Sequence, residues 1–189
     1  MIQTDKKKFI GFIGTIGSGK STACTFFSSR GYHVVSLSDI IRAYVHEHNY
    51  SDDRDSLTHH ANQLKEKYGM AYFAQQSYDN VIKANVSAVV FDSIRHPDEA
   101  SFLKEKGVYL VGIKANQTQR FHRISNRKHS TDFVDLTTFI NQDENELKGA
   151  NQGQNIEACY TLCDQCITND KELEHFTETL NSIFSTFVS

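Results

Sequence analysis

The chain has 189 residues, of which 39% are hydrophobic and 23% are charged, and its formal net charge is −3. This length and composition fit one soluble domain. The slightly negative charge gives no general attraction to nucleic acid, so we expect no polynucleotide partner. No apolar run approaches the length of a membrane-spanning helix, and residues 1–8 lack the apolar core of a secretory signal. We therefore expect no membrane partner and a cytoplasmic location.

Residues 14–21 match the phosphate-binding loop pattern G-x-x-x-x-G-K-[ST] at every position. The apolar run 9–13 before them predicts a buried strand, and residues 21–27 after them can begin a helix. The three glycines let backbone N–H groups curl around an anion, and the helix N-terminus faces the phosphates. Lys20 can reach the β- and γ-phosphate oxygens, and the Ser21 hydroxyl can bind Mg²⁺. The predicted ATP-binding residues here are Gly14, Thr15, Ile16, Gly17, Ser18, Gly19, Lys20, Ser21 and Thr22.

Apolar runs and helical stretches alternate along the rest of the chain, which is typical of a parallel sheet with crossover helices. Further strands are predicted at 32–37, 88–92, 108–113 and 165–168. Helices are predicted to begin near 38 and 97 and to cover 56–68, 71–83, 117–128 and 171–187, with a mobile helical segment at 132–147. The predicted fold class is α/β: a three-layer phosphate-loop NTPase fold with a five-stranded, mostly parallel sheet. Residues 1–189 would form a single domain with a small mobile lid at about 120–150.

Ligands of such sheets bind beyond the carboxyl ends of the strands, so the residues that follow each strand are informative. Asp92 ends the third predicted strand, where an aspartate can hold Mg²⁺ or cap a helix. With a phosphate loop in the same chain, we expect Ser21 and Asp92 to form the magnesium site. Arg95 would project over the same rim, where its planar fork suits a phosphate; a surface salt bridge is the alternative.

Asp39 and Arg42 lie in the first turn of the helix that follows the second predicted strand. Asp39 could position or deprotonate an acceptor hydroxyl, or it could cap this helix, and the two roles are equally consistent with the sequence.

Arg120, Arg123 and Arg127 are spaced by three and four residues, so they share one face of a predicted helix. A basic helix face is usually just solvated, but beside a phosphate loop these arginines suit a clamp on the transferring phosphates. Phe121 and Ile124 would lie on the buried side, and the segment after the helix would act as the lid that excludes water.

Three cysteines, Cys159, Cys163 and Cys166, lie near the C-terminus. A structural metal site would need a fourth ligand, and no second cysteine pair is present, so we expect small buried hydrophobic side chains. The histidines at 46, 48, 59 and 60 have no recognisable ligand spacing, and we expect them mostly at the surface.

These motifs resemble the nucleoside monophosphate kinase group of phosphate-loop proteins. Residues 38–42 are similar to the acceptor-side segment of adenylate kinases, and residues 120–127 resemble the helix that enters their lid. Residues 91–99 resemble a branch that contains dephospho-coenzyme A kinase and phage deoxynucleoside monophosphate kinases. The C-terminal part resembles the kinase-like domains of deoxycytidylate deaminase-type proteins, which implies that Asn169 and Asp170 face the base of ATP.

The resemblance implies ATP- and Mg²⁺-dependent phosphoryl transfer to a nucleotide-like acceptor, with a (deoxy)nucleoside monophosphate as first choice, by a monomer or homodimer. On this hypothesis the catalytic residues are Lys20, Asp39, Arg95, Arg123 and Arg127, with Arg123 also on the ATP side. The acceptor-binding residues are Asp39, Arg42 and Arg95. Two alternatives stay open: a dephospho-coenzyme A kinase, in which Asp39 is a general base, and a nucleotide sensor that regulates a partner.

Overall fold

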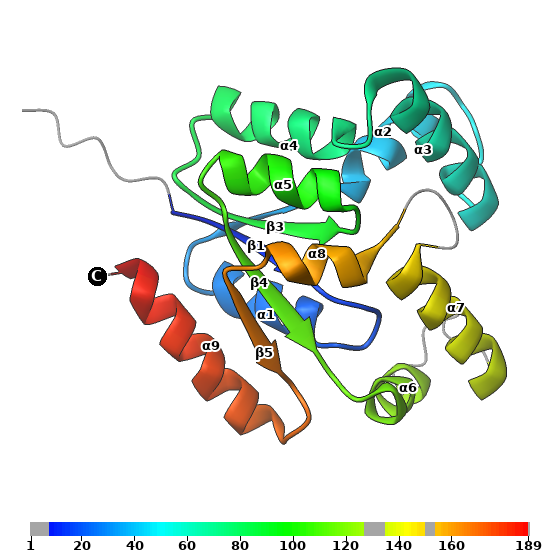
Figure 1. Ribbon diagram of the computed structural model, residues 1–189. Helices are drawn as coiled ribbons and strands as arrows, with labels where there is room; N and C mark the ends of the chain where they lie inside the picture. Colours follow the sequence, from blue (N-terminus) through cyan, green and yellow to red (C-terminus); the bar gives the residue numbers. More distant parts are fainter. Residues whose placement is uncertain (1–7, 127–134, 150–153, 189) are drawn as a thin grey trace, which may run out of the picture.

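The computed structural model describes residues 8–126, 135–149 and 154–188 (Figure 1). Their centre is one parallel sheet of five strands in the order β2-β3-β1-β4-β5. The strands are β1 (Lys8–Ile13), β2 (His33–Ser36), β3 (Ala88–Ile94), β4 (Tyr109–Lys114) and β5 (Gln165–Thr168). Both sides of the sheet are covered by helices, so the predicted α/β fold class is confirmed.

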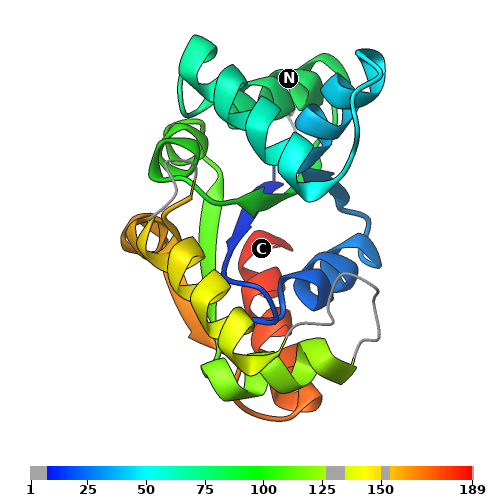
Figure 2. The same cartoon turned by 90° about the vertical axis from the view of Figure 1, so that its right-hand side faces the viewer.

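Helices α1 (Lys20–Ser28) and α9 (Leu173–Val188) pack on one face of the sheet (Figure 1). The other face carries α4 (Tyr72–Lys83), α5 (Pro97–Glu105) and α8 (Ile156–Leu162). Two helix pairs flank the carboxyl ends of the strands, one on each side (Figure 2). These pairs are α2 (Ser38–Glu47) with α3 (Arg54–Tyr68), and α6 (Gln117–Asn126) with α7 (Leu136–Lys148).

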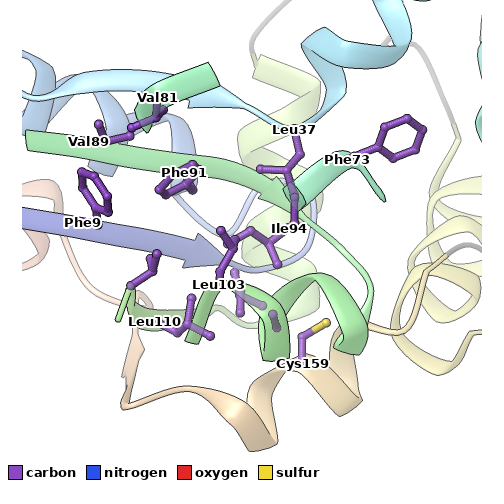
Figure 3. Packing of buried hydrophobic residues seen from close by; sticks show 14 of the residues in the cluster. Phe9, Leu37, Phe73, Val81, Val89, Phe91, Ile94, Leu103, Leu110 and Cys159 are labelled. Atoms are coloured by element: carbon purple, nitrogen blue, oxygen red, sulfur yellow. The ribbon is translucent and has the colours of Figure 1, made fainter. Parts of the chain in front are cut away.

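The core lies on both faces of the sheet, which explains why the central strands read as unbroken apolar runs. Successive residues of β1 point to opposite faces, so Phe9 joins one buried cluster and Ile10 the other. Figure 3 shows the first cluster, where Phe9 and Phe91 meet edge to face with ring centroids 5.9 Å apart. This packing fixes the strand ends from which the site residues project.

The predicted elements are present, with two differences. Helix α8 was not assigned from the sequence, and β3 continues two residues past its predicted end at Asp92. It does so through Ser93, whose φ of 63° is unusual for a residue with a side chain. The pairing of β1 with β3 shifts register at this point. In the ranges the structure describes, no helix is long and apolar enough to cross a membrane.

The cysteine prediction holds only in part. Cys159 is buried as expected and Cys163 is half-buried, but Cys166 is exposed, because β5 is the edge strand of the sheet. The histidines at 46, 48 and 59 are exposed as predicted, while His60 is half-buried and stacks on Tyr50 at 4.2 Å between ring centroids.

Candidate active site

The loop between β1 and α1 has the conformation of an anion cradle. Gly17 and Gly19 have φ values of 77° and 116°, which residues with a side chain rarely adopt. Gly14 serves another purpose: a Cβ there would lie 2.6 Å from the carbonyl oxygen of Ile113 and from the Ser18 hydroxyl. Two of the three glycines therefore supply positive φ values, and the third allows a close approach to β4.

Lys20, the first residue of α1, folds back on this loop. Its ammonium group donates to the carbonyl oxygens of Gly14 at 2.7 Å and Thr15 at 3.0 Å. Burial lowers the pKa of Lys20 from 10.5 to about 8, although the nearby Asp92 carboxylate acts in the opposite direction. The charges of Arg95 and Glu146 also influence this pKa, so all three groups lie within electrostatic reach of Lys20.

Ser21 and Asp92 border the same open cavity of about 560 Å³. The Oδ1 atom of Asp92 is buried and accepts no hydrogen bond from the described residues. A buried carboxylate oxygen normally has a partner, and carboxylate and hydroxyl oxygens are ligands that Mg²⁺ prefers. These two residues therefore fit the magnesium site that the sequence predicts.

Asp39, Arg42 and Arg95 are exposed near the ends of β2 and β3. The two strand ends are joined where the Leu37 N–H donates to the Asp92 carbonyl oxygen at 3.0 Å. Within the described ranges, no side-chain hydrogen bond or ion pair engages any of these three charged groups. Helix α2 begins at Ser38 with Leu37 at the N-cap position and no side-chain cap, so the capping alternative for Asp39 is wrong.

The backbone of Arg95 is held by a residue that sequence reasoning placed only in a helix turn. The buried Glu99 carboxylate accepts from the N–H groups of Arg95 at 3.0 Å and His96 at 3.1 Å, and it pairs with Lys65 at 3.1 Å. Asn155 N–H donates to the Arg95 carbonyl oxygen at 2.8 Å. Glu99 completes a capping box on α5, and a histidine at the cap position, instead of Ser or Thr, hides this signal in the sequence.

Arg120 does not belong to a free clamp, which corrects the sequence prediction. Its guanidinium is buried and makes two hydrogen bonds to Asp143 of α7, one of them 2.6 Å long. It also donates to the carbonyl oxygens of Ala115 at 3.0 Å and Ile16 at 3.3 Å. Four of its five N–H donors are thus engaged by protein acceptors and the side chain is buried, so Arg120 connects the two helices and the loop.

Arg123, one turn later on α6, reaches the phosphate loop. It donates to the carbonyl oxygens of Asn169 at 2.9 Å and Gly17 at 3.4 Å. Ile124 is buried as predicted and Phe121 is half-buried. Arg127 lies outside the described residues.

Asn169 and Asp170 follow β5 and connect it to the loop and to α6. The Asn169 amide donates to the Ser18 carbonyl oxygen at 2.8 Å, and Asp170 accepts from the Asn116 N–H at 2.6 Å. Both side chains thus support the walls of the site, and their predicted position beside the base of ATP stays a prediction.

Two features of the rim escaped the sequence reasoning. The carboxylate of Glu146 in α7 acts to raise the pKa of Lys20 through its charge, although the sequence predicts only a mobile lid for this segment. Three serine hydroxyls, Ser36, Ser38 and Ser93, meet between β2 and β3, where the Ser36 Oγ atom lies 2.8 Å from each of the others. No sequence spacing signals either feature, because each depends on how separate elements pack.

Solved structures with a similar fold include small-molecule kinases. The chain resembles shikimate kinase from Acinetobacter baumannii in complex with shikimate with a TM-score of 0.60 and 11% identity, over 96% of this chain and 95% of that one. It resembles dephospho-CoA kinase from Campylobacter jejuni with a TM-score of 0.56 and 16% identity, over 95% and 96% of the two chains. At this identity the likeness shows a phosphate-loop kinase-like fold.

Sequence relatives cover nearly the whole chain. A UPF0200 protein of Saccharolobus islandicus is 30% identical over 172 residues, which are 89% of this chain and 88% of the relative. Another, from Methanococcus vannielii, is 29% identical over 185 residues, which are 96% and 97% of the two chains. The AAA domain family matches residues 10–148. With this match across most of its length and a relative at 30% identity, the chain belongs to the AAA domain family and to the UPF0200 proteins.

Proposed function

We propose that this protein transfers the γ-phosphoryl group of ATP to a small acceptor that carries a phosphate, most specifically a (deoxy)nucleoside monophosphate. The observation that carries the proposal is a pair of exposed arginines, Arg42 and Arg95, which follow β2 and β3, the two strands next to the strand that leads into the phosphate loop. The charge of Arg95 acts on the pKa of Lys20 in that loop. Neither has a protein partner within the described ranges, whereas Arg120 and Arg123 do. An arginine fork without a protein partner is suited to bidentate binding of a phosphate.

The donor side is assigned to the loop and its neighbours. Backbone N–H groups of residues 14–22 and the N-terminus of α1 bind the ATP phosphates. When ATP binds, the Lys20 ammonium group gives up its hydrogen bonds to the two loop carbonyl oxygens and donates to phosphate oxygens instead. Ser21 and Asp92 would hold Mg²⁺, which would neutralise charge on the phosphates of ATP. Arg123 donates to the Gly17 carbonyl oxygen of the loop, which supports a role in stabilising charge on the transferred phosphoryl group, and we assign the same role to Arg127.

The role of Asp39 should differ between two kinds of acceptor. A monophosphate is already ionised and needs no base, so Asp39 would only position the acceptor. A sugar hydroxyl, as in dephospho-coenzyme A, must lose a proton, and an exposed carboxylate without a protein partner could accept it. The second candidate function is therefore a dephospho-coenzyme A kinase, and Asp39→Asn should reduce that activity far more than transfer to a monophosphate.

The test is incubation with Mg-ATP and a panel of nucleoside monophosphates, deoxynucleoside monophosphates and dephospho-coenzyme A, with products identified by mass. A nucleoside diphosphate supports the first proposal, and coenzyme A supports the second. Arg95→Gln and Arg42→Gln should raise the KM for the acceptor at least tenfold. Lys83→Gln, at the exposed end of α4, is the matched control. Nucleotide binding without product from any acceptor overturns transfer and indicates a nucleotide sensor.

A further inference from the structure

Two cysteines lie side by side at the junction of α8 and β5, and neither is among the residues assigned to phosphoryl transfer. Cys163 ends α8 as its C-cap residue, and Cys166 is the second residue of β5. Both thiols are free; the Cys163 Sγ donates to the Cys159 carbonyl oxygen at 3.6 Å and the Cys166 Sγ donates to the Tyr160 carbonyl oxygen at 3.8 Å. They lie over Gly112 of β4, where a Cβ atom would be 2.9 Å from the Cys166 sulfur and 3.1 Å from the Cys163 sulfur. The absence of a side chain at Gly112 therefore makes room for both sulfur atoms.

The turn that carries the two cysteines is fixed by residues on either side. Asp164 exchanges two hydrogen bonds with the backbone of Leu110, of 2.8 and 2.9 Å, and pairs with Lys104 at 3.0 Å. Cys166 is held opposite Gly112 by the pairing of β4 with β5. A disulfide forms without backbone strain only if the two Cα positions already suit it. Here the β4–β5 pairing and the turn at Asp164 hold both sulfur atoms against Gly112.

The two thiols differ in their access to solvent. Cys166 is exposed, whereas Cys163 is half-buried. Burial and the neighbouring Cys166 thiol raise the pKa of Cys163 to about 12. Since the thiolate is the nucleophile, Cys166 is the group that an external reagent meets, and Cys163 is placed to react second.

We propose that Cys163 and Cys166 form a dithiol modification site that exchanges with small-molecule disulfides and closes into an intramolecular disulfide. In the first step the Cys166 thiolate attacks a sulfur of the reagent RSSR, which forms the mixed disulfide Cys166–S–S–R and releases one RS⁻. In the second step the Cys163 thiolate attacks the Cys166 sulfur and releases the second RS⁻. The two protein thiols lose two electrons and two protons, and RSSR is reduced to two RSH. This chemistry does not depend on the phosphoryl transfer proposed above.

The test uses the full-length protein in buffers of reduced and oxidised glutathione at fixed ratios, followed by trapping of free thiols and peptide mass mapping. Wild type should lose two trappable thiols, both at 163 and 166, and should carry no bound glutathione. Cys163→Ser should instead keep one glutathione on Cys166, because the resolving thiol is missing. Cys166→Ser should react at least tenfold more slowly than wild type, and the buried Cys24 and Cys159 should stay reduced in every variant.

Three results would overturn the proposal. One is a stable glutathione adduct on Cys166 in wild type, which would show that Cys163 cannot reach it. Another is a disulfide between two copies of the chain through Cys166. The third is equal reaction rates for Cys163→Ser and Cys166→Ser, which would remove the distinction between an attacking and a resolving thiol. A scan of wild-type melting temperature with and without glutathione disulfide confirms that the protein stays folded during the reaction.

Discussion

Arg120 of α6 and Asp143 of α7 form an ion pair whose side chains are 5% and 0% exposed. Gln117 donates a hydrogen bond to the same carboxylate at 2.9 Å, and Arg120 also donates to the carbonyl oxygen of Ile16 in the phosphate loop. A Cβ atom on Gly17 would lie 2.8 Å from the Arg120 carbonyl oxygen, so α6 packs directly on the loop. Helix α7 is therefore connected through one buried charge pair to the phosphate loop.

Asp143→Ala should lower the free energy of unfolding by about 3–5 kcal/mol, because the Arg120 charge would stay buried without its partner. Urea denaturation measures the change. Glu144→Ala is the matched control. Glu144 is exposed and pairs with Lys148 at 3.8 Å, so this variant should lower the free energy of unfolding by about 0.5 kcal/mol or less. Similar small losses for both variants would contradict a structural role for the buried pair.

Ser93 should tolerate glycine better than alanine. Its φ of 63° is strained for any residue with a Cβ atom, and both variants lose the 2.8 Å hydrogen bond with Ser36. Only glycine relieves the strain, so Ser93→Gly should be more stable than Ser93→Ala by about 1 kcal/mol in chemical denaturation. At Ser101, inside helix α5, the alanine variant should instead be more stable than the glycine variant by about 1 kcal/mol. The same order at both positions would contradict strain at Ser93.

The sheet and the donor loop could be predicted because their signals are local. The phosphate-loop pattern lies between a predicted strand and a predicted helix, and Asp92 follows an apolar run. These features depend on residues that are neighbours in the sequence. The structure places Ser21 and Asp92 around one cavity, and the magnesium site itself stays a prediction. The order of the strands then brings the segments after β1, β2 and β3 to one rim.

The rest of the site depends on contacts between distant segments. Arg120 was expected to face the phosphates because nothing near it in sequence reveals Asp143, which lies 23 residues away. The spacing of arginines along a helix cannot distinguish a solvated helix face from a buried ion pair. Likewise, Glu99 reads as an ordinary residue of the first turn of a helix until Lys65, from α3, is seen beside it. Tertiary pairing decides the role of a charged side chain, and sequence spacing alone does not.

Glu99→Gln should weaken acceptor binding more than ATP binding if the proposed function is correct. The carboxylate holds the backbone N–H of Arg95 at 3.0 Å, so its loss should let Arg95 shift while the phosphate loop stays in place. We expect the acceptor KM to rise by at least threefold more than the ATP KM, with a loss of about 3 kcal/mol in stability from the broken pair with Lys65. Glu105→Gln, at the exposed end of α5, is the control. Equal changes in both KM values would contradict a positioning role.

Lys20 should make both stability and ATP affinity depend on pH above about 8. Burial lowers its pKa from 10.5 to about 8 in the folded protein. Between these two values the unfolded chain binds more protons than the folded one, so the contribution of Lys20 to stability rises with pH. Below pH 8 the charged, buried ammonium destabilises the free protein, and Lys20→Met should stabilise it at pH 7 by about 1–3 kcal/mol. The difference in stability between variant and wild type should shrink as the pH rises from 8 to 10.

In the free protein burial favours the neutral form of Lys20. A bound phosphate should reverse this, because an anion beside Lys20 favours its protonated form. The affinity of wild type for Mg-ATP should therefore fall as the pH rises through 8, and binding at pH 8.5 should take up a proton. Calorimetric titrations in two buffers with different ionisation enthalpies measure this uptake directly. Lys20→Met should show no measurable binding. An ATP affinity that stays constant from pH 7 to 9, with no proton uptake, would show that the Lys20 ammonium group does not bind the phosphates.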